Sequence, residues 1–111
     1  MTDATGVSSV EGVGETKVLV LHGWGMDSSV WNWCRDQLDL DRFTFAFFDF
    51  PGYGTHRPHA PADGIDGMAR AALAAVDALG WNSFAVLGHS MGGGTAMRVA
   101  TLAPDRVTAV C

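Results

Sequence analysis

The most constraining feature of this sequence is a G-x-S-x-G turn between an apolar run and a helical pattern. The apolar run 84–87 predicts a buried strand, and the apolar residues after Gly92 recur with helical spacing. A chain that passes from strand to helix over so few residues must turn sharply, with Ser90 at the apex. The sequence therefore predicts that Ser90 lies in strained backbone geometry at the end of a sheet.

Two glycines flank Ser90, two residues away on either side. A side chain at Gly88 or Gly92 would collide where the strand and the helix pack together, so both are predicted to be structural. The positive end of the following helix would point toward Ser90 and favour an anion there. A nucleophile is therefore the predicted role of Ser90, and a chance match is the alternative.

The composition is that of one small domain. The chain has 111 residues, of which 48% are hydrophobic and 17% charged, too apolar for a disordered chain. The net charge of -5 and the scattered basic residues argue against nucleic-acid binding. No secretory signal or membrane-length apolar run is visible, so we expect a cytoplasmic protein without membrane contacts. Cys34 and Cys111 fit no metal or redox spacing, so we expect free thiols, no metal and no cofactor.

The first strong strand signal is the continuous apolar run 17–21, which is typical of a strand buried on both faces. A glycine-rich loop follows at 22–25. Apolar residues then recur at three- and four-residue steps and predict a helix over 28–38, with Asp27 or Ser28 as its N-cap.

The same succession of elements then repeats. The aromatic-rich run 43–48 predicts a strand, and a loop with one proline and two glycines follows at 49–54. One helical face over 68–79 predicts a helix, with Asp63 or Asp66 as its N-cap and a glycine at the usual stop position.

The ends of the chain complete the expected organisation. Residues 1–15 are predicted to be a flexible tail or a weak first strand, and residues 16–111 a partial domain that closes with a strand at 107–110. Alternating strands and helices predict an α/β fold with a mostly parallel sheet and flanking helices. Reactive loops in such sheets lie beyond the carboxyl ends of the strands.

Three loops on that edge resemble the α/β-hydrolase family. His22-Gly23-Trp24-Gly25 is similar to its HG oxyanion loop, residues 49–54 to its D-x-P-G-x-G loop, and residues 88–92 to its nucleophile elbow. The resemblance covers about residues 17–110 and implies the N-terminal half of that fold. The HGWG form is similar to esterases that act on pimeloyl-carrier-protein methyl esters. Broad carboxylesterases, lactonases and cofactor-free peroxidases share nearly the same loops.

The resemblance implies a small-molecule ester or acyl substrate and leaves an acyl carrier protein open as a partner. It assigns Ser90 as the nucleophile and the backbone N–H groups of Trp24 and Met91 as the oxyanion hole. The side chain of Trp24 is expected either to form a wall of an acyl pocket or to pack within its loop. Of the histidines, His22 is expected to hold the shape of its loop rather than to act as a base.

The other histidines are not expected to take part in catalysis either. We expect His89 to pack away from Ser90, and His56 and His59 to be solvated. After Ser90 the chain contains no histidine. A serine hydroxyl needs a histidine and an acid, which follow the serine in this fold.

We therefore expect residues 1–111 to be truncated before the triad acid and histidine. On their own they should hydrolyse esters poorly or not at all. Asp105, the only acid after the serine, is interpreted as a surface residue. The alternative is a non-catalytic member of the family that acts as a receptor or interaction protein.

Overall fold

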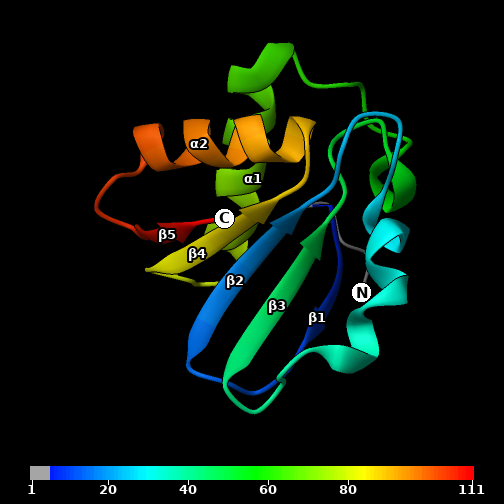
Figure 1. Ribbon diagram of the computed structural model, residues 1–111. Coiled ribbons are helices and arrows are strands. Elements are labelled where there is room, and N and C mark those ends of the chain that lie inside the picture. Colours follow the sequence, from blue (N-terminus) through cyan, green and yellow to red (C-terminus); the bar gives the residue numbers. More distant parts are fainter. Residues whose placement is uncertain (1–5) are drawn as a thin grey trace.

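The computed structural model describes residues 6–111, which form one sheet with helices around it (Figure 1). The strands are β1 (Val7–Glu11), β2 (Thr16–Leu21), β3 (Phe43–Phe48), β4 (Phe84–Gly88) and β5 (Val107–Val110). The α-helices are α1 (Gly64–Ala78) and α2 (Met91–Leu102), and the 3-10 helices are η1 (Ser28–Trp33), η2 (Arg35–Gln37) and η3 (Gly54–His56).

The sheet is mostly parallel, as the alternation of elements predicted. Its strand order is β1-β3-β2-β4-β5. β2 pairs in parallel with both β3 and β4, and β5 pairs in parallel with β4. The carboxyl ends of β2, β3 and β4 therefore meet at one edge, which brings the three glycine-rich loops together (Figure 1).

The first strand departs from this parallel arrangement. β1 pairs antiparallel with β3 and lies at the edge of the sheet. It occupies part of the segment 1–15 that was expected to be a tail or a weak strand. Residues 1–5 of that segment lie outside the described residues. Cys34 and Cys111 are both free, as expected.

The predicted single helix over 28–38 is wrong, because the chain forms the two short 3-10 helices η1 and η2 there. Asp27 is the N-cap of η1 and accepts a hydrogen bond from the amide of Ser29. Cys34, with φ -120° and ψ -1°, separates the two helices. The tryptophans and the valine of this segment favour an α-helix only weakly, which explains why a continuous helix does not form.

The other two helices agree with prediction, apart from the start of α1. This helix begins at Gly64, four residues before the apolar face that predicted it, and Asp63 is its N-cap residue. The Asp63 side chain makes no capping hydrogen bond. Gly80 follows with φ 75°, a left-handed conformation that ends the helix as expected.

The main core lies between the sheet and the two α-helices, which pack on the same face. In Figure 1, α1 lies behind the strands. This core joins apolar residues of β2, β3 and β4 to alanines and valines of the helices, with Leu19, Leu21, Phe48, Val76, Val86 and Val99 at its centre. The opposite face buries a smaller cluster of Val18, Val20, Phe45 and Phe47 under residues such as Trp31 and Leu38.

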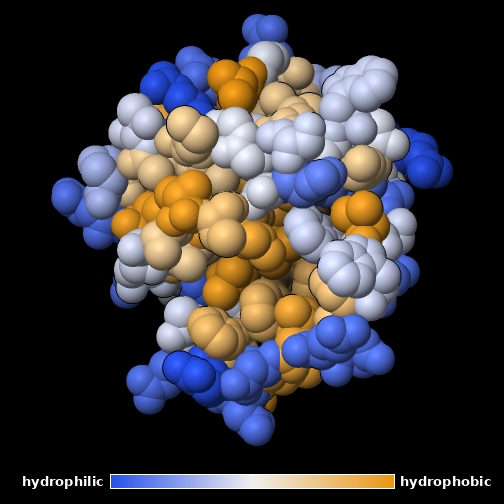
Figure 2. All heavy atoms as spheres, in the orientation of Figure 1, coloured by the Kyte–Doolittle hydropathy of each residue, from blue (hydrophilic) through white to orange (hydrophobic). Residues whose placement is uncertain are grey.

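Part of this second face remains uncovered. Figure 2 shows hydrophobic side chains gathered in the middle of the face turned toward the viewer. β5 is the last strand in the order, and Val110 within it is 44% exposed. β5 is therefore poorly covered, with three of its four residues exposed. Across residues 6–111, no helix combines the length and the apolar character needed to cross a membrane.

Candidate active site

The turn between β4 and α2 holds Ser90 in an unusual backbone conformation. Its φ is 57° and its ψ is -113°. Among residues 6–111 it is the only residue other than glycine with a positive φ. An L-amino acid adopts this region reluctantly, so the surrounding structure must impose it. The Ser90 side chain is exposed and stands directly before the first residue of α2.

The two flanking glycines lie where the backbone approaches itself closely. A Cβ at Gly88 would overlap the carbonyl oxygen of Gly92, and a Cβ at Gly92 would overlap the carbonyl oxygen of Leu21. The amide of His89 donates to that same Leu21 oxygen at 3.1 Å. The turn is therefore packed directly against the end of β2, with no room for side chains at either glycine.

Two backbone amides near this turn are available to a ligand. Met91 is the first residue of α2, where amides have no partner within the helix. Trp24 lies in the loop after β2, between Gly23 and Gly25, and Gly25 has φ 74°. Within the part of the chain that the structure describes, neither amide donates to a protein acceptor. The helix start also favours negative charge.

The Trp24 side chain is 76% exposed, so the expectation that it packs within its own loop is wrong. Met26, in the same loop, is 37% exposed. Both side chains reach solvent at the edge of the sheet that carries the serine turn. The other expectation, a wall of an acyl pocket, stays a prediction.

His22 is fully buried and both of its ring nitrogens are bonded, so the prediction that it holds the shape of its loop is confirmed. Its Nε2 accepts from the amide of Phe50 at 3.1 Å, so its Nδ1 carries the proton and donates to the carbonyl of Gly23 at 2.8 Å. Burial lowers the pKa of His22 from its ordinary value of 6.5, against the weaker opposing effects of Gly23 and Asp49. The imidazole of His22 is therefore neutral in the folded protein.

The remaining three histidines differ in how far they are buried. His56 is only 5% exposed and its Nδ1 is bonded to the carbonyl of Asp49 at 2.8 Å, so the prediction that it is solvated is wrong. Its position at the end of η3 turns it inward onto Phe48. His59 is exposed, as expected. His89 is exposed too, and its ring is nearly perpendicular to that of Trp31, with 6.5 Å between the centroids.

No acid or base of the described residues is bonded to Ser90. Neither ring nitrogen of His22 is free to act, and no hydrogen bond within residues 6–111 joins a histidine or a carboxylate to the Ser90 hydroxyl. Asp105 is exposed in the connection between α2 and β5. Within residues 6–111, the Ser90 turn thus lies beside the loop that carries Trp24, and the serine has no hydrogen-bonded base.

Asp49 opens the 49–54 loop, and neither its burial nor a role for its side chain was predicted. It is 1% exposed, and its carboxylate accepts hydrogen bonds from Ser28 and Thr55. Because these partners are far from Asp49 in sequence or lie in an irregular loop, no periodic pattern could have revealed them.

Two open cavities lie beside the loops that follow β2 and β3. One of about 510 Å³ lies between these loops, and the other of about 630 Å³ extends toward β1. Asp27, Ser29, Gly54 and Arg57 line both, and Ser90 lines neither. Hydrogen bonds from Ser29 hold the pKa of Asp27 below its usual value. Within residues 6–111, no group of three or more His, Cys, Asp or Glu side chains is arranged so that it could hold a metal ion.

Comparison with known proteins places these features in a family. A family model of the alpha/beta hydrolase fold matches residues 16–111. A pimeloyl-[acyl-carrier protein] methyl ester esterase of Citrobacter koseri is 38% identical over 101 residues, or 90% of this chain and 37% of the esterase. The dihydrolipoyllysine-residue acetyltransferase component of the acetoin cleaving system of Cupriavidus necator is 37% identical over 100 residues, or 90% of this chain and 26% of that protein.

Solved structures give the same result. A marine microorganism esterase superposes with a TM-score of 0.80 and 29% identity, over 89% of this chain and 37% of the esterase. A Pseudomonas aeruginosa protein proposed to be an epoxide hydrolase superposes with a TM-score of 0.76 and 28% identity, over 88% of this chain and 33% of that one. The chain thus spans between 26% and 37% of the length of these two relatives and two structures.

Proposed function

Since the chain belongs to the α/β-hydrolase fold family, we propose that it carries the nucleophile and the oxyanion hole of a serine hydrolase that cleaves carboxylic esters. The observation that carries this proposal is the exposed Ser90 hydroxyl, which the positive φ of its backbone presents at the start of α2. The esterases among its relatives support the substrate class.

In the proposed reaction, Ser90 Oγ attacks the carbonyl carbon of the ester while its proton passes to a general base. The electrons of the C=O bond move to the oxygen, and the amides of Trp24 and Met91 donate hydrogen bonds to this oxyanion. The base then returns the proton to the leaving alcohol, and water releases the acid from the acyl-serine. Loss of one oxyanion donor typically lowers kcat by about 10²- to 10³-fold.

The base and the acid that orients it are proposed to lie outside residues 1–111. The arrangement of the histidines supports this, because none is bonded to Ser90 and none follows it in the sequence. The relatives' greater length supports it as well, since the chain covers only 37% of the Citrobacter esterase. The isolated residues should therefore show little or no turnover.

The chemistry of serine favours an acyl substrate over an epoxide. A serine oxygen that opened an epoxide would form an ether, which water does not cleave under mild conditions. The same oxygen on an ester forms an acyl-serine, which water does cleave. Relatives named as a methyl ester esterase and an acetyltransferase component both act on acyl groups. An acyl carrier protein as the partner, and the cytoplasm as the location, remain predictions.

The test is a fluorophosphonate probe, which forms a stable adduct with an activated serine, applied to the full-length protein. We expect mass spectrometry to place the adduct on Ser90, and Ser90→Ala to abolish labelling. Ser83 is an exposed serine just before β4, so Ser83→Ala is the matched control and should be labelled like the parent protein. Labelling of Ser90→Ala at the parent rate would refute the proposal, and a folded protein that never labels would favour a non-catalytic receptor.

A further inference from the structure

The loop between β2 and η1 is attached at both of its ends to the two residues that follow β3. At the first end, His22 bonds the carbonyl of Gly23 with one nitrogen and the amide of Phe50 with the other, at 2.8 and 3.1 Å. At the second end, the amide of Ser28 donates to Asp49 Oδ1 at 2.7 Å. The two ends of the loop therefore cannot shift without breaking a contact to residue 49 or 50.

The Asp49 carboxylate is itself held in one orientation. Its Oδ2 accepts from both the amide and the hydroxyl of Thr55, at 2.9 and 2.7 Å. It forms no ion pair within residues 6–111. A Cβ at Gly54 would lie 2.6 Å from Oδ2, so only glycine lets the backbone come so near. A buried charge whose hydrogen bonds are lost is costly, which makes this arrangement stiff.

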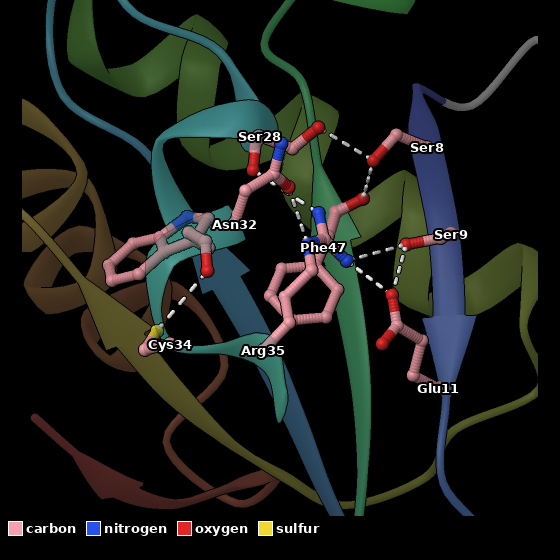
Figure 3. A network of polar contacts seen from close by, with 9 residues as sticks. Ser8, Ser9, Glu11, Ser28, Asn32, Cys34, Arg35 and Phe47 are labelled. Atoms are coloured by element: carbon pink, nitrogen blue, oxygen red, sulfur yellow. Dashed lines mark hydrogen bonds and ion pairs between the residues drawn. The ribbon is translucent and has the colours of Figure 1, made fainter. Parts of the chain in front are cut away.

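Ser28, the residue that Asp49 binds, is fixed from the other side as well. Its hydroxyl is bonded to the hydroxyl of Ser8 in β1 at 2.7 Å, and its carbonyl accepts from Arg35 at 3.2 Å. Figure 3 shows Arg35 paired with Glu11 and lying over the ring of Phe47. All three polar groups of Ser28 are thus used, which makes it a fixed end point for the loop.

We propose that Asp49 is a positioning residue that holds the Trp24 amide in place to receive the oxyanion beside Ser90. It acts through Ser28, and Thr55 supports it by orienting the carboxylate. This inference rests on the proposed function, because it concerns the same oxyanion hole. A donor that moves by about 1 Å can lower the rate by about 10²-fold. Because the donor acts mainly in the transition state, its displacement lowers kcat and leaves KM nearly unchanged.

The decisive experiment removes the Thr55 hydroxyl from the full-length protein and compares three variants. Thr55→Val deletes the bond to Asp49 without changing the side-chain volume, and Thr55→Ser restores it. Thr44→Val is the matched control, since Thr44 Oγ1 donates to the carbonyl of Gly14 at 2.7 Å at the opposite end of the sheet. Hydrolysis of p-nitrophenyl butyrate gives kcat and KM, and hydrogen exchange follows the amides of the loop.

We expect Thr55→Val to lower kcat by about tenfold, less than the loss of a whole oxyanion donor, and to leave KM within about twofold. Asp49→Asn should lower kcat further, because its NH₂ group must face one of the N–H donors of Ser28 and Thr55. Thr55→Ser should match the parent protein. Thr44→Val should unfold at a lower urea concentration than the parent but keep its kcat. Loop amides should exchange faster in Thr55→Val than in Thr44→Val.

The inference is overturned if Thr55→Val and Thr44→Val have equal kcat values, or if Thr55→Ser is as impaired as Thr55→Val. These outcomes differ from a failure of the proposed function, which Ser90→Ala reveals by retaining turnover. Should the full-length protein lack esterase activity, hydrogen exchange decides alone: equal loop exchange in Thr55→Val and Thr44→Val would show that Asp49 does not hold the loop.

Discussion

Replacing Ser90 by glycine should make the protein more stable while abolishing the proposed activity. The φ of 57° and ψ of -113° at Ser90 place an L-amino acid in a sparsely populated region, and such strain costs about 1–3 kcal/mol. Glycine adopts this conformation freely but loses about 0.4–1 kcal/mol through the greater freedom of its unfolded chain. The exposed hydroxyl has no hydrogen bond within residues 6–111 that would be lost. The net gain for Ser90→Gly should therefore be about 1 kcal/mol or slightly more.

Ser90→Ala is the control that isolates the backbone contribution, because it also removes the hydroxyl but keeps the Cβ and therefore the strain. Urea unfolding of the three proteins measures the difference, provided that the slope m is unchanged. With m of about 2 kcal/mol/M, a gain of about 1 kcal/mol raises the midpoint of Ser90→Gly by about 0.5 M over that of Ser90→Ala. Equal midpoints for the glycine and alanine variants would show that the turn stores no strain.

Three further outcomes follow from the contacts described above. Gly92→Ala places a Cβ against the carbonyl of Leu21 at the end of β2 and should lower the free energy of unfolding in urea by about 2 kcal/mol or more. Gly93→Ala is the control and should be tolerated, because its Cβ would meet nothing nearer than 3.5 Å. Burial lowers the pKa of His22 below 6.5, so the unfolded state binds more protons than the folded state near and below this pH. The free energy of unfolding should therefore fall as the pH drops below 6.5. His22→Gln should flatten this part of the profile of urea midpoint against pH. Arg98→Met breaks an ion pair with Asp66 that is open to solvent and should leave the urea midpoint unchanged.

The parts of the fold that the sequence could predict are those in which the cause is local. The runs 17–21, 43–48 and 84–87 are strands because continuous apolar residues can be buried on both faces only within a covered sheet. The need for Gly88 is equally local, because a Cβ there would overlap the carbonyl of Gly92 within the same turn. Asp63, one of the two predicted N-caps, is the N-cap residue of α1, although the apolar face that predicted this helix begins only at residue 68.

The parts that could not be predicted depend on contacts between distant segments. His56 lies in a polar, proline-containing loop, yet it is buried because its ring packs on Phe48 and bonds the carbonyl of Asp49. Nothing in the residues around His56 indicates this contact. The same holds for the bond between Asp49 and Ser28, whose residues are separated by a strand and two 3-10 helices.

The two donors of the proposed oxyanion hole therefore differ in what fixes them. The Met91 amide follows Ser90 directly, and α2 sets its direction, since the amide of Gly94 already donates to the Ser90 carbonyl at 3.1 Å. The Trp24 amide belongs to a separate loop whose place depends on contacts to residues 49 and 50. Substitutions around Asp49 can thus alter one donor while the serine turn stays intact. Two proteins with the same G-x-S-x-G motif can therefore differ in catalytic rate because of loops that the motif does not include.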